Sequence, residues 1–128
     1  MDKNDKGFTL IELVVVIAII AILAAIALSI LSSSRRMARE VTAKHDLKKF
    51  VQAEDAYYLE YGSYNGVAGD IISGDPDVPS TISFQAFKPS PQVVITINAI
   101  DPIFTASATY TGTGTVWQYR HDTGEITK

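Results

Sequence analysis

An uncharged apolar run near the N-terminus constrains this chain more than any other feature. From Leu13 to Leu31 the sequence holds no charged residue and one polar side chain, Ser29. As a helix the run would be about 28 Å long, close to the roughly 30 Å hydrocarbon core of a bilayer. Apolar residues occupy every face of that helix, and a domain this small has no core able to enclose it. The run therefore predicts a helix that a membrane or neighbouring copies must cover.

Three interpretations of the run compete: a permanent anchor, a removable secretory signal, and a helix that leaves the membrane to pack against copies of itself. Residues 25–27, Ala-Ile-Ala, have the small-x-small form that signal peptidase accepts. Cleavage after Ala27 would release a soluble binding domain. The mixed charge before the run argues against a signal, because Asp2 and Asp5 are interleaved with Lys3 and Lys6.

A carboxylate stands at the head of the run. Charged side chains near the centre of a spanning helix cost about 2.5 to 3.5 kcal/mol, and less near its boundary. A disposable signal gains nothing from such a residue. Glu12 is therefore a candidate functional residue, and the alternative is a solvated carboxylate just outside the hydrocarbon.

Composition narrows the classes of function. The chain has 128 residues, enough for one domain, a formal net charge of -3 and no cysteine. No basic face is evident for neutralising phosphates, so we predict no specific nucleic-acid binding. The absence of cysteine excludes disulfides, thiolate metal sites and cysteine nucleophiles.

Residues 7–13, Gly-Phe-Thr-Leu-Ile-Glu-Leu, followed by the apolar run, resemble the processing signature of type IV pilins and the related pseudopilins. The resemblance is close over about residues 6–31 and looser along the following helix. It implies that a prepilin peptidase removes a leader, residues 1–7, by cutting after Gly7. It further implies that Phe8 becomes the N-methylated first residue and that Glu12 pairs with the Phe8 amine of an adjacent subunit.

Two features depart from the family pattern. Ser29 stands where these helices usually carry proline, so a proline kink is not expected. Positive charge is also denser after the run, at residues 35, 36 and 39, than before it, and this favours the opposite membrane orientation. We follow the family orientation, because a translocated domain can override loop charge.

The helix is predicted to continue well beyond the run. No glycine or proline occurs between Gly7 and Gly62, and helix formers dominate from Arg35 onward. The sequence predicts one helix from Phe8 to Tyr61, ended by Gly62. Its second half repeats apolar residues at three- and four-residue intervals, which indicates one face packed on a sheet; the residues are Met37, Val41, Leu47, Phe50, Val51, Tyr57, Tyr58 and Tyr61.

The remainder predicts an antiparallel meander. Residues 62–81, rich in glycine and proline, are expected to form a surface loop. Alternating patterns then predict strands at residues 82–86, 93–99, 104–110, 116–120 and 125–127. The predicted fold class is α+β: a long N-terminal helix whose second half packs on a C-terminal antiparallel sheet, as in pilins.

Candidate chemistry is sparse in the rest of the chain. His45 and His121 are isolated in sequence and are predicted to be solvated. The aspartates at 70, 75 and 77, and Asp122 with Glu125, could offer oxygen ligands to calcium, although they are also ordinary turn residues. Tyrosines 57, 58, 61 and 64 are expected to pack between helix and sheet. We predict no catalytic set, no metal site and no cofactor.

These observations predict a structural subunit of a type IV pilus-like filament rather than an enzyme. Its predicted domains are the leader 1–7, a transmembrane and assembly helix 8–31, and a periplasmic or extracellular globular domain 32–128. The implied partners are copies of itself, prepilin peptidase and inner-membrane assembly machinery. The implied location is the bacterial inner membrane, then an extracellular pilus or a periplasmic pseudopilus. A pseudopilin of type II secretion and the exported domain released after Ala27 are the alternatives.

Overall fold

The computed structural model describes residues 7–128, so the predicted leader lies outside the described residues except for Gly7. The chain divides into two compact units, one ending at Arg35 and the other spanning Arg36–Lys128. Helix α1, Leu10–Tyr61, contributes its first half to one unit and its second half to the other. The predicted single helix is therefore confirmed, with its start two residues later than expected.

In the first unit every described residue is exposed. The apolar side chains there range from Val14 at 43% exposed to Phe8 at 89%. The helix is continuous through Ser29, whose hydroxyl donates a 2.9 Å hydrogen bond to the carbonyl of Ile26. With no proline to remove a backbone donor, nothing interrupts the helical ladder here.

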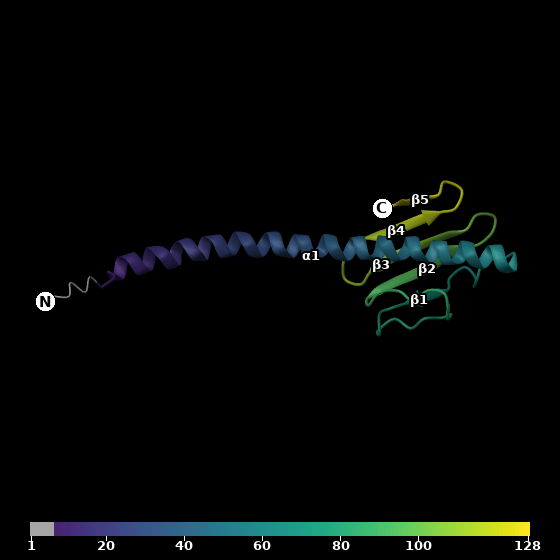
Figure 1. Cartoon of the computed structure of the whole chain (residues 1–128), viewed down its shortest axis with the longest axis horizontal. Coiled ribbons are helices and arrows are strands. Elements are labelled where there is room, and N and C mark those ends of the chain that lie inside the picture. Colours follow the sequence, from purple (N-terminus) through teal and green to yellow (C-terminus); the bar gives the residue numbers. More distant parts are fainter. Residues whose placement is uncertain (1–6) are drawn as a thin grey trace. The chain divides into compact units, whose positions relative to one another are not determined.

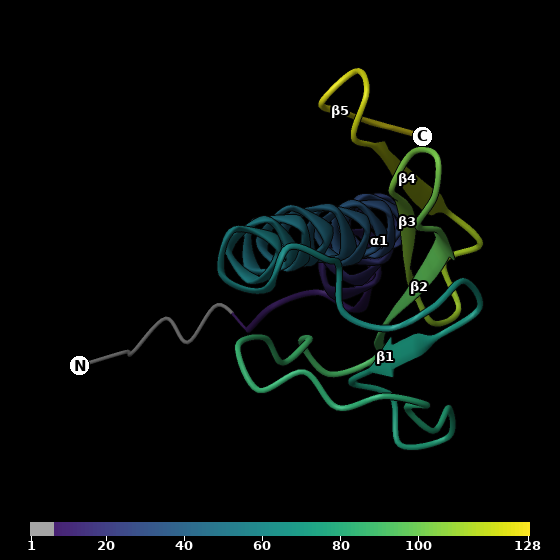
Figure 2. The ribbon, with the colours of Figure 1, turned by 90° about the vertical axis from the view of Figure 1, so that its right-hand side faces the viewer.

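The second unit is an antiparallel sheet covered on one face by α1 (Figures 1 and 2). Its five strands follow one another in chain order, so the predicted meander and the α+β class are confirmed. The strands are β1 (Ile71–Ser73), β2 (Val93–Ala99), β3 (Thr105–Tyr110), β4 (Val116–Arg120) and β5 (Glu125–Thr127).

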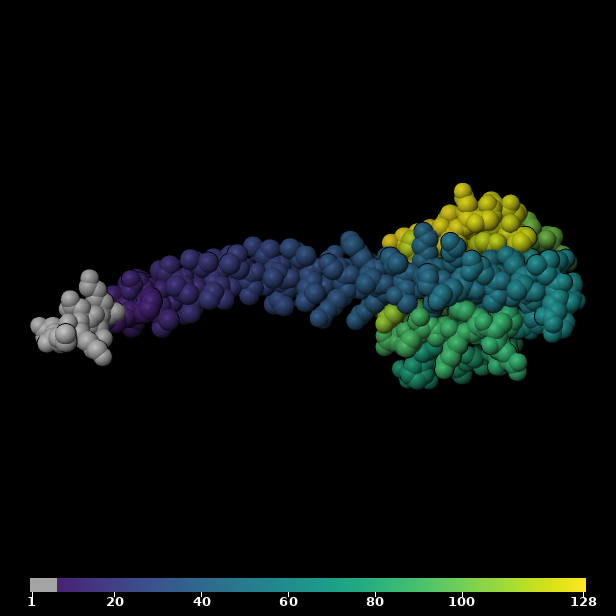
Figure 3. All heavy atoms as spheres, viewed as in Figure 1, coloured from purple at the N-terminus to yellow at the C-terminus, as the bar shows by residue number. Residues whose placement is uncertain are grey.

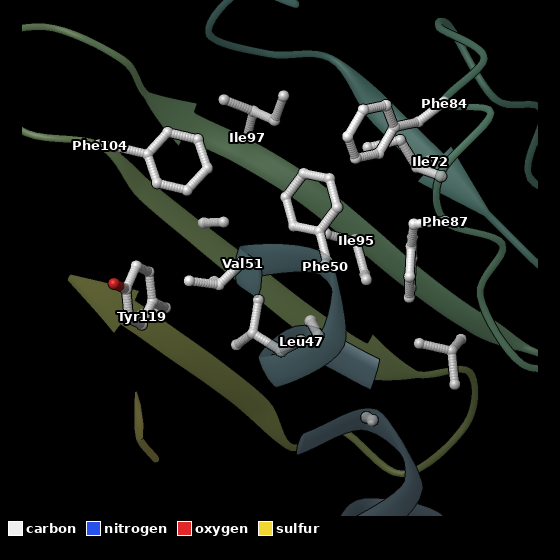
Figure 4. Close-up of a cluster of buried hydrophobic side chains, with 14 residues drawn as sticks. Leu47, Phe50, Val51, Ile72, Phe84, Phe87, Ile95, Ile97, Phe104 and Tyr119 are labelled. Carbon is white, nitrogen blue, oxygen red and sulfur yellow. The ribbon is translucent and has the colours of Figure 1, made fainter. Parts of the chain in front are cut away.

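Phe50 of α1 lies at the centre of the core (Figure 4). Its ring packs edge-on against Phe84 and Phe87, with centroids 6.0 and 5.6 Å away. Ile95 and Ile97 of β2 are fully buried in the same cluster. Because all members of this core lie between residues 43 and 119, the second unit buries its apolar surface by itself.

The predicted apolar face of the helix is half right. Leu47, Phe50 and Val51 are buried as expected. Four predicted members are instead 46–63% exposed: Met37, Val41, Tyr58 and Tyr61. Their places on the covered face are taken by acidic residues, since Glu40, Asp46 and Glu54 are buried. Periodicity alone could not distinguish the two sets, because the acidic residues recur at similar helical intervals.

The predicted strand at 82–86 is wrong. Phe84 and Phe87 are both buried, while Ala86 is exposed. The backbone makes a turn there, with Phe87 N–H donating to the Phe84 carbonyl at 3.2 Å. A spacing of three residues brings both rings to the core, so the apparent alternation at 82, 84 and 86 did not reflect a strand.

A short strand was missed within the predicted loop 62–81. β1 pairs with β2, placing Ile72 opposite Ile95 and burying it. Three residues are too few to show alternation, and the pairing depends on a partner more than twenty residues away. After β1 the chain passes so close to Ser90 that a Cβ on Gly74 would lie 2.1 Å from the Ser90 carbonyl oxygen, so only glycine fits.

Gly62 ends α1 as predicted. It adopts a φ of 73°, and its N–H donates to the Tyr58 carbonyl at 2.8 Å. This left-handed residue after the last turn is the usual glycine C-cap.

Candidate processing and assembly site

The N-terminal candidate residues lie at the start of α1. Gly7, Phe8 and Thr9 precede the helix and are non-helical and exposed. A peptidase needs access to a backbone outside the helix, and the Gly7–Phe8 bond lies in such an exposed stretch. Among the described residues, Phe8 is the most exposed large apolar side chain, so its ring has no place in the chain's own core.

A reciprocal capping box links Thr9 and Glu12. One carboxylate oxygen, Oε2, accepts hydrogen bonds from the Thr9 backbone N–H and hydroxyl, both at 2.8 Å. In return the Glu12 N–H donates to the Thr9 hydroxyl at 3.3 Å. The spacing Thr-Leu-Ile-Glu is that of a threonine N-cap with glutamate at the third helical position. Sequence reasoning missed this role, although the spacing itself was the signal.

Capping gives Glu12 a position that matters for its predicted role. Its carboxylate is held at the backbone nitrogen of Thr9, one residue from the bond after Gly7. Cleavage there would create an ammonium group on Phe8. A carboxylate so close to the helix start is placed to meet an ammonium group, from its own chain or from a neighbour.

The fold of the described chain does not itself require glycine at position 7. A Cβ added there would meet no atom within 4 Å, and its φ is not in the left-handed range. Where intramolecular packing does not require glycine, an external demand for a small residue explains it better. A narrow peptidase pocket would make such a demand.

α1 is long and apolar enough, by length and composition, to cross a membrane, and its most apolar stretch is not buried. In residues 7–39 no side chain is buried. The described residues therefore do not cover this apolar surface. Lipid or other chains must cover it.

The remaining candidates do not converge on a reactive site. His45 is exposed, and His121 is half exposed with Nδ1 3.8 Å from Asp55 Oδ1. Within residues 7–128 no group of three or more histidine, aspartate or glutamate side chains is arranged to hold a metal. Asp70 and Asp75 instead accept hydrogen bonds from loop residues, Asp70 from Val67 N–H at 2.8 Å and from Thr81, and Asp75 from Thr111.

The tyrosines divide between packing and solvent. Tyr64 stacks on Phe104 with ring centroids 4.4 Å apart, and Tyr58 lies 4.8 Å from Tyr64. Tyr57 is partly buried against the core, while Tyr61 is exposed beside it.

Three carboxylates on α1 are buried, and none was anticipated: Glu40, Asp46 and Glu54. Glu40 accepts hydrogen bonds from Lys128 at 2.8 Å and Arg36 at 3.1 Å. The bonds from Lys128 and Thr115 outweigh burial and lower the pKa of Glu40 to about 2. The Lys128–Glu40 ion pair connects residue 128, after β5, to the helix. Glu40 and Glu54 each lie seven residues from the buried Leu47, so all three share one face of the helix.

Glu54 is fully buried, and its carboxylate has fewer hydrogen-bond partners than that of Glu40. Oε2 accepts the Asn65 N–H at 2.9 Å, while Oε1 has no hydrogen-bond partner among the described residues. Burial raises the pKa of Glu54 to about 6, partly offset by the Asn65 bond. This carboxylate connects the helix to the loop that follows it, at a cost when charged.

Residues 2–28 match the family model of the prokaryotic N-terminal methylation motif. A comparison with curated proteins finds no match to this sequence. The motif, the apolar helix and the α+β domain define a class of membrane-anchored precursor with a pilin-like arrangement. The chain carries the prepilin signature of type IV pilins and pseudopilins, which indicates a structural subunit rather than an enzyme.

Proposed function

We propose that this chain is made as a precursor in the bacterial inner membrane, cut between Gly7 and Phe8, methylated on the new Phe8 amine, and polymerised through α1. The product is a type IV pilus-like filament whose roles include adhesion, motility or DNA uptake. The methylation motif over residues 2–28 is the observation that carries this proposal. Prepilin peptidase and the inner-membrane assembly machinery are the partners it requires.

The proposed domains follow the processing steps. Residues 1–7 are the leader, 8–31 the transmembrane and assembly helix, and 32–128 the globular domain outside the inner membrane. Exposure throughout residues 7–39 supports the second of these, because that surface is uncovered before assembly. Lipid covers it first and neighbouring helices cover it afterwards.

Assembly exchanges one apolar surrounding for another, so hydrophobic burial alone does not drive it. Helix packing and polar pairing must supply the specificity. A carboxylate in a dry bundle requires a cation, and the Phe8 ammonium of an adjacent copy provides one for Glu12. The pair would also fix the axial offset between helices, as one polar core residue fixes register in a coiled coil.

The capping box calls for two variants at position 12. Glu12→Gln preserves a cap acceptor at the third helical position but removes the charge, whereas Glu12→Ala removes both. If the ammonium pair drives assembly, both variants should insert and be processed normally while filament yield falls at least about tenfold in each. Sedimentation of sheared cell-surface material, with membrane content as control, measures both quantities. Normal filaments from Glu12→Gln with loss in Glu12→Ala would assign Glu12 to capping and contradict the pairing.

A pseudopilin of a type II secretion system is the alternative within the same class, and it uses the same processing and helix packing. It differs in the fate of the fibre, which stays periplasmic. Surface-sheared filaments favour the pilus. A chain retained in the periplasm whose deletion stops protein export would favour the pseudopilus.

A further inference from the structure

A groove of about 820 Å³ lies at the C-terminal end of α1, within the second unit. Asp55, Tyr58 and Leu59 contribute from the helix, and the loops around Asp101 and His121 form the opposite wall. Leu59 is 86% exposed, an unusual degree for leucine on a folded domain. Nothing in the described chain covers it.

The chemistry of this groove suits cationic side chains. The Asp55 side chain is 45% exposed, and its Oδ1 lies 3.8 Å from Nδ1 of His121. Asp101 is exposed and makes no ion pair within residues 7–128. Tyr58 and Tyr64 line the same groove, with their ring centroids 4.8 Å apart. Carboxylates next to aromatic rings bind ammonium groups by charge-assisted hydrogen bonds and cation–π attraction.

The complementary charge lies earlier on the same helix. Arg36 pairs with Glu40, Arg39 lies 5.7 Å from the Tyr110 ring, and Lys44 lies 4.8 Å from the Trp117 ring. Lys48 and Lys49 are exposed and have no such partner among the described residues. Figure 3 shows this part of α1 uncovered between the two flanks of the domain.

We propose that the groove at the end of α1 receives Lys48 and Lys49 of a second copy of this chain. The inference rests on the proposed filament and names a contact between its globular domains. An acidic site and a basic site in different places on one surface pair heterologously, and such pairing is suited to an open polymer. In this contact and in the Glu12–Phe8 pair, a residue of one copy binds a residue that lies earlier in the sequence of the next copy. Between parallel helices, both contacts therefore displace the neighbouring copy along the helix axis in the same direction.

Cross-linking tests this contact in the full chain. Because the sequence has no cysteine, introduced cysteines report without background. Gln52 is exposed one turn beyond Lys48, and Leu59 lines the groove. Within one chain they are about 10 Å apart along the helix, too far for a disulfide. Filaments of Gln52→Cys/Leu59→Cys should give a ladder of linked chains under mild oxidation. Val116→Cys, also an exposed apolar position, replaces Leu59→Cys in the control and should not link.

Charge reversal tests the chemistry. Lys48→Glu with Lys49→Glu should lower the cross-linked fraction at least about fivefold, and so should Asp55→Lys with Asp101→Lys. Combining all four substitutions should restore it to within about twofold of the parent. Lys88→Glu, an exposed lysine that is not part of the helix and does not line the groove, is the matched control and should change little.

Filaments that sediment normally but give no ladder, or whose ladder ignores both reversals, would overturn the contact and leave the proposed function standing. A groove that serves a foreign cationic partner gives the first of these results. Chains that are never processed or never sediment contradict the proposed function instead.

Discussion

The two halves of α1 bury apolar surface in opposite ways. From residue 40 to residue 54 one face packs against the sheet, and Leu47 and Phe50 are fully buried. In residues 7–39 no side chain is buried, although this part is the more apolar of the two. Hydrophobicity therefore predicts which surface must be covered, but not whether the same chain or another molecule covers it. One half is covered by its own chain, and the other depends on lipid or on copies.

Gly7→Val is expected to have the largest effect, because it should block removal of the leader that precedes the uncovered half of α1. A Cβ at position 7 would meet no atom of the described residues within 4 Å, so folding should be unchanged while processing stops and only precursor accumulates. Ala27→Val is the matched variant, since it would block cleavage by signal peptidase instead. Mass on denaturing gels reports both, and a block by Ala27→Val alone would contradict cleavage after Gly7.

Phe50→Ala should strongly destabilise the domain that covers the second half of α1. Removing a fully buried aromatic ring costs about 3 to 5 kcal/mol, most of the stability of a small domain. Ile19→Ala, in the uncovered half at 53% exposure, should change the free energy of unfolding of the domain by less than about 0.5 kcal/mol. Denaturation of the detergent-solubilised chain, followed by Trp117 fluorescence, compares them. Equal losses would show that the two halves share one core.

Glu54→Gln tests whether the buried carboxylate on the covered face destabilises the domain when it is charged. The pKa of Glu54 rises from 4.5 to about 6 on folding, so the folded state holds this proton more tightly than the unfolded state. Its contribution to stability is therefore greatest below about pH 4.5, falls as the pH rises to 6, and stays low above.

The neutral variant should be more stable than the parent at pH 7, by on the order of 1 to 2 kcal/mol, with the difference shrinking towards pH 4. Glu60→Gln, an exposed position on the same helix, serves as control. A parent whose stability rises between pH 4.5 and 6 relative to Glu54→Gln would contradict the assignment.

Thr9→Ala has the smallest expected effect. Losing the N-cap costs about 1 kcal/mol of local helix stability, so the first turn should fray while the domain keeps its melting temperature. Hydrogen exchange of the Glu12 and Leu13 amides, which donate to the Thr9 hydroxyl and carbonyl, measures the fraying directly. Unchanged exchange there would mean that the capping box does not stabilise the start of α1.

Local signals were sufficient for the long elements. The glycine-free stretch before Gly62 predicted α1, and alternation predicted β2 and β3, because each signal extends over several residues. β1 could not be foreseen, since its three residues take their structure from pairing with β2. The turn joining Phe84 and Phe87 was likewise set by tertiary packing on Phe50.

The candidate site shows the same division. Glu12 stood out in the sequence because a carboxylate at the head of an apolar helix requires an explanation, whereas Gly7 and Phe8 stood out only through the resemblance to the pilin processing signature. The capping role of Glu12 was readable from its spacing to Thr9, yet it became evident only from the geometry. The groove at the end of α1 joins residues from 55 to 122, and no local pattern could have brought these together.

The mass of the mature N-terminus tests the claim that the chain is cut between Gly7 and Phe8. Intact and peptide mass spectrometry of the chain purified from its own cells should find a protein that begins at Phe8 and carries one added methyl group. A chain beginning at Leu28 would contradict the claim in favour of release by signal peptidase. A chain retaining residues 1–7 in assembled filaments would contradict cleavage altogether.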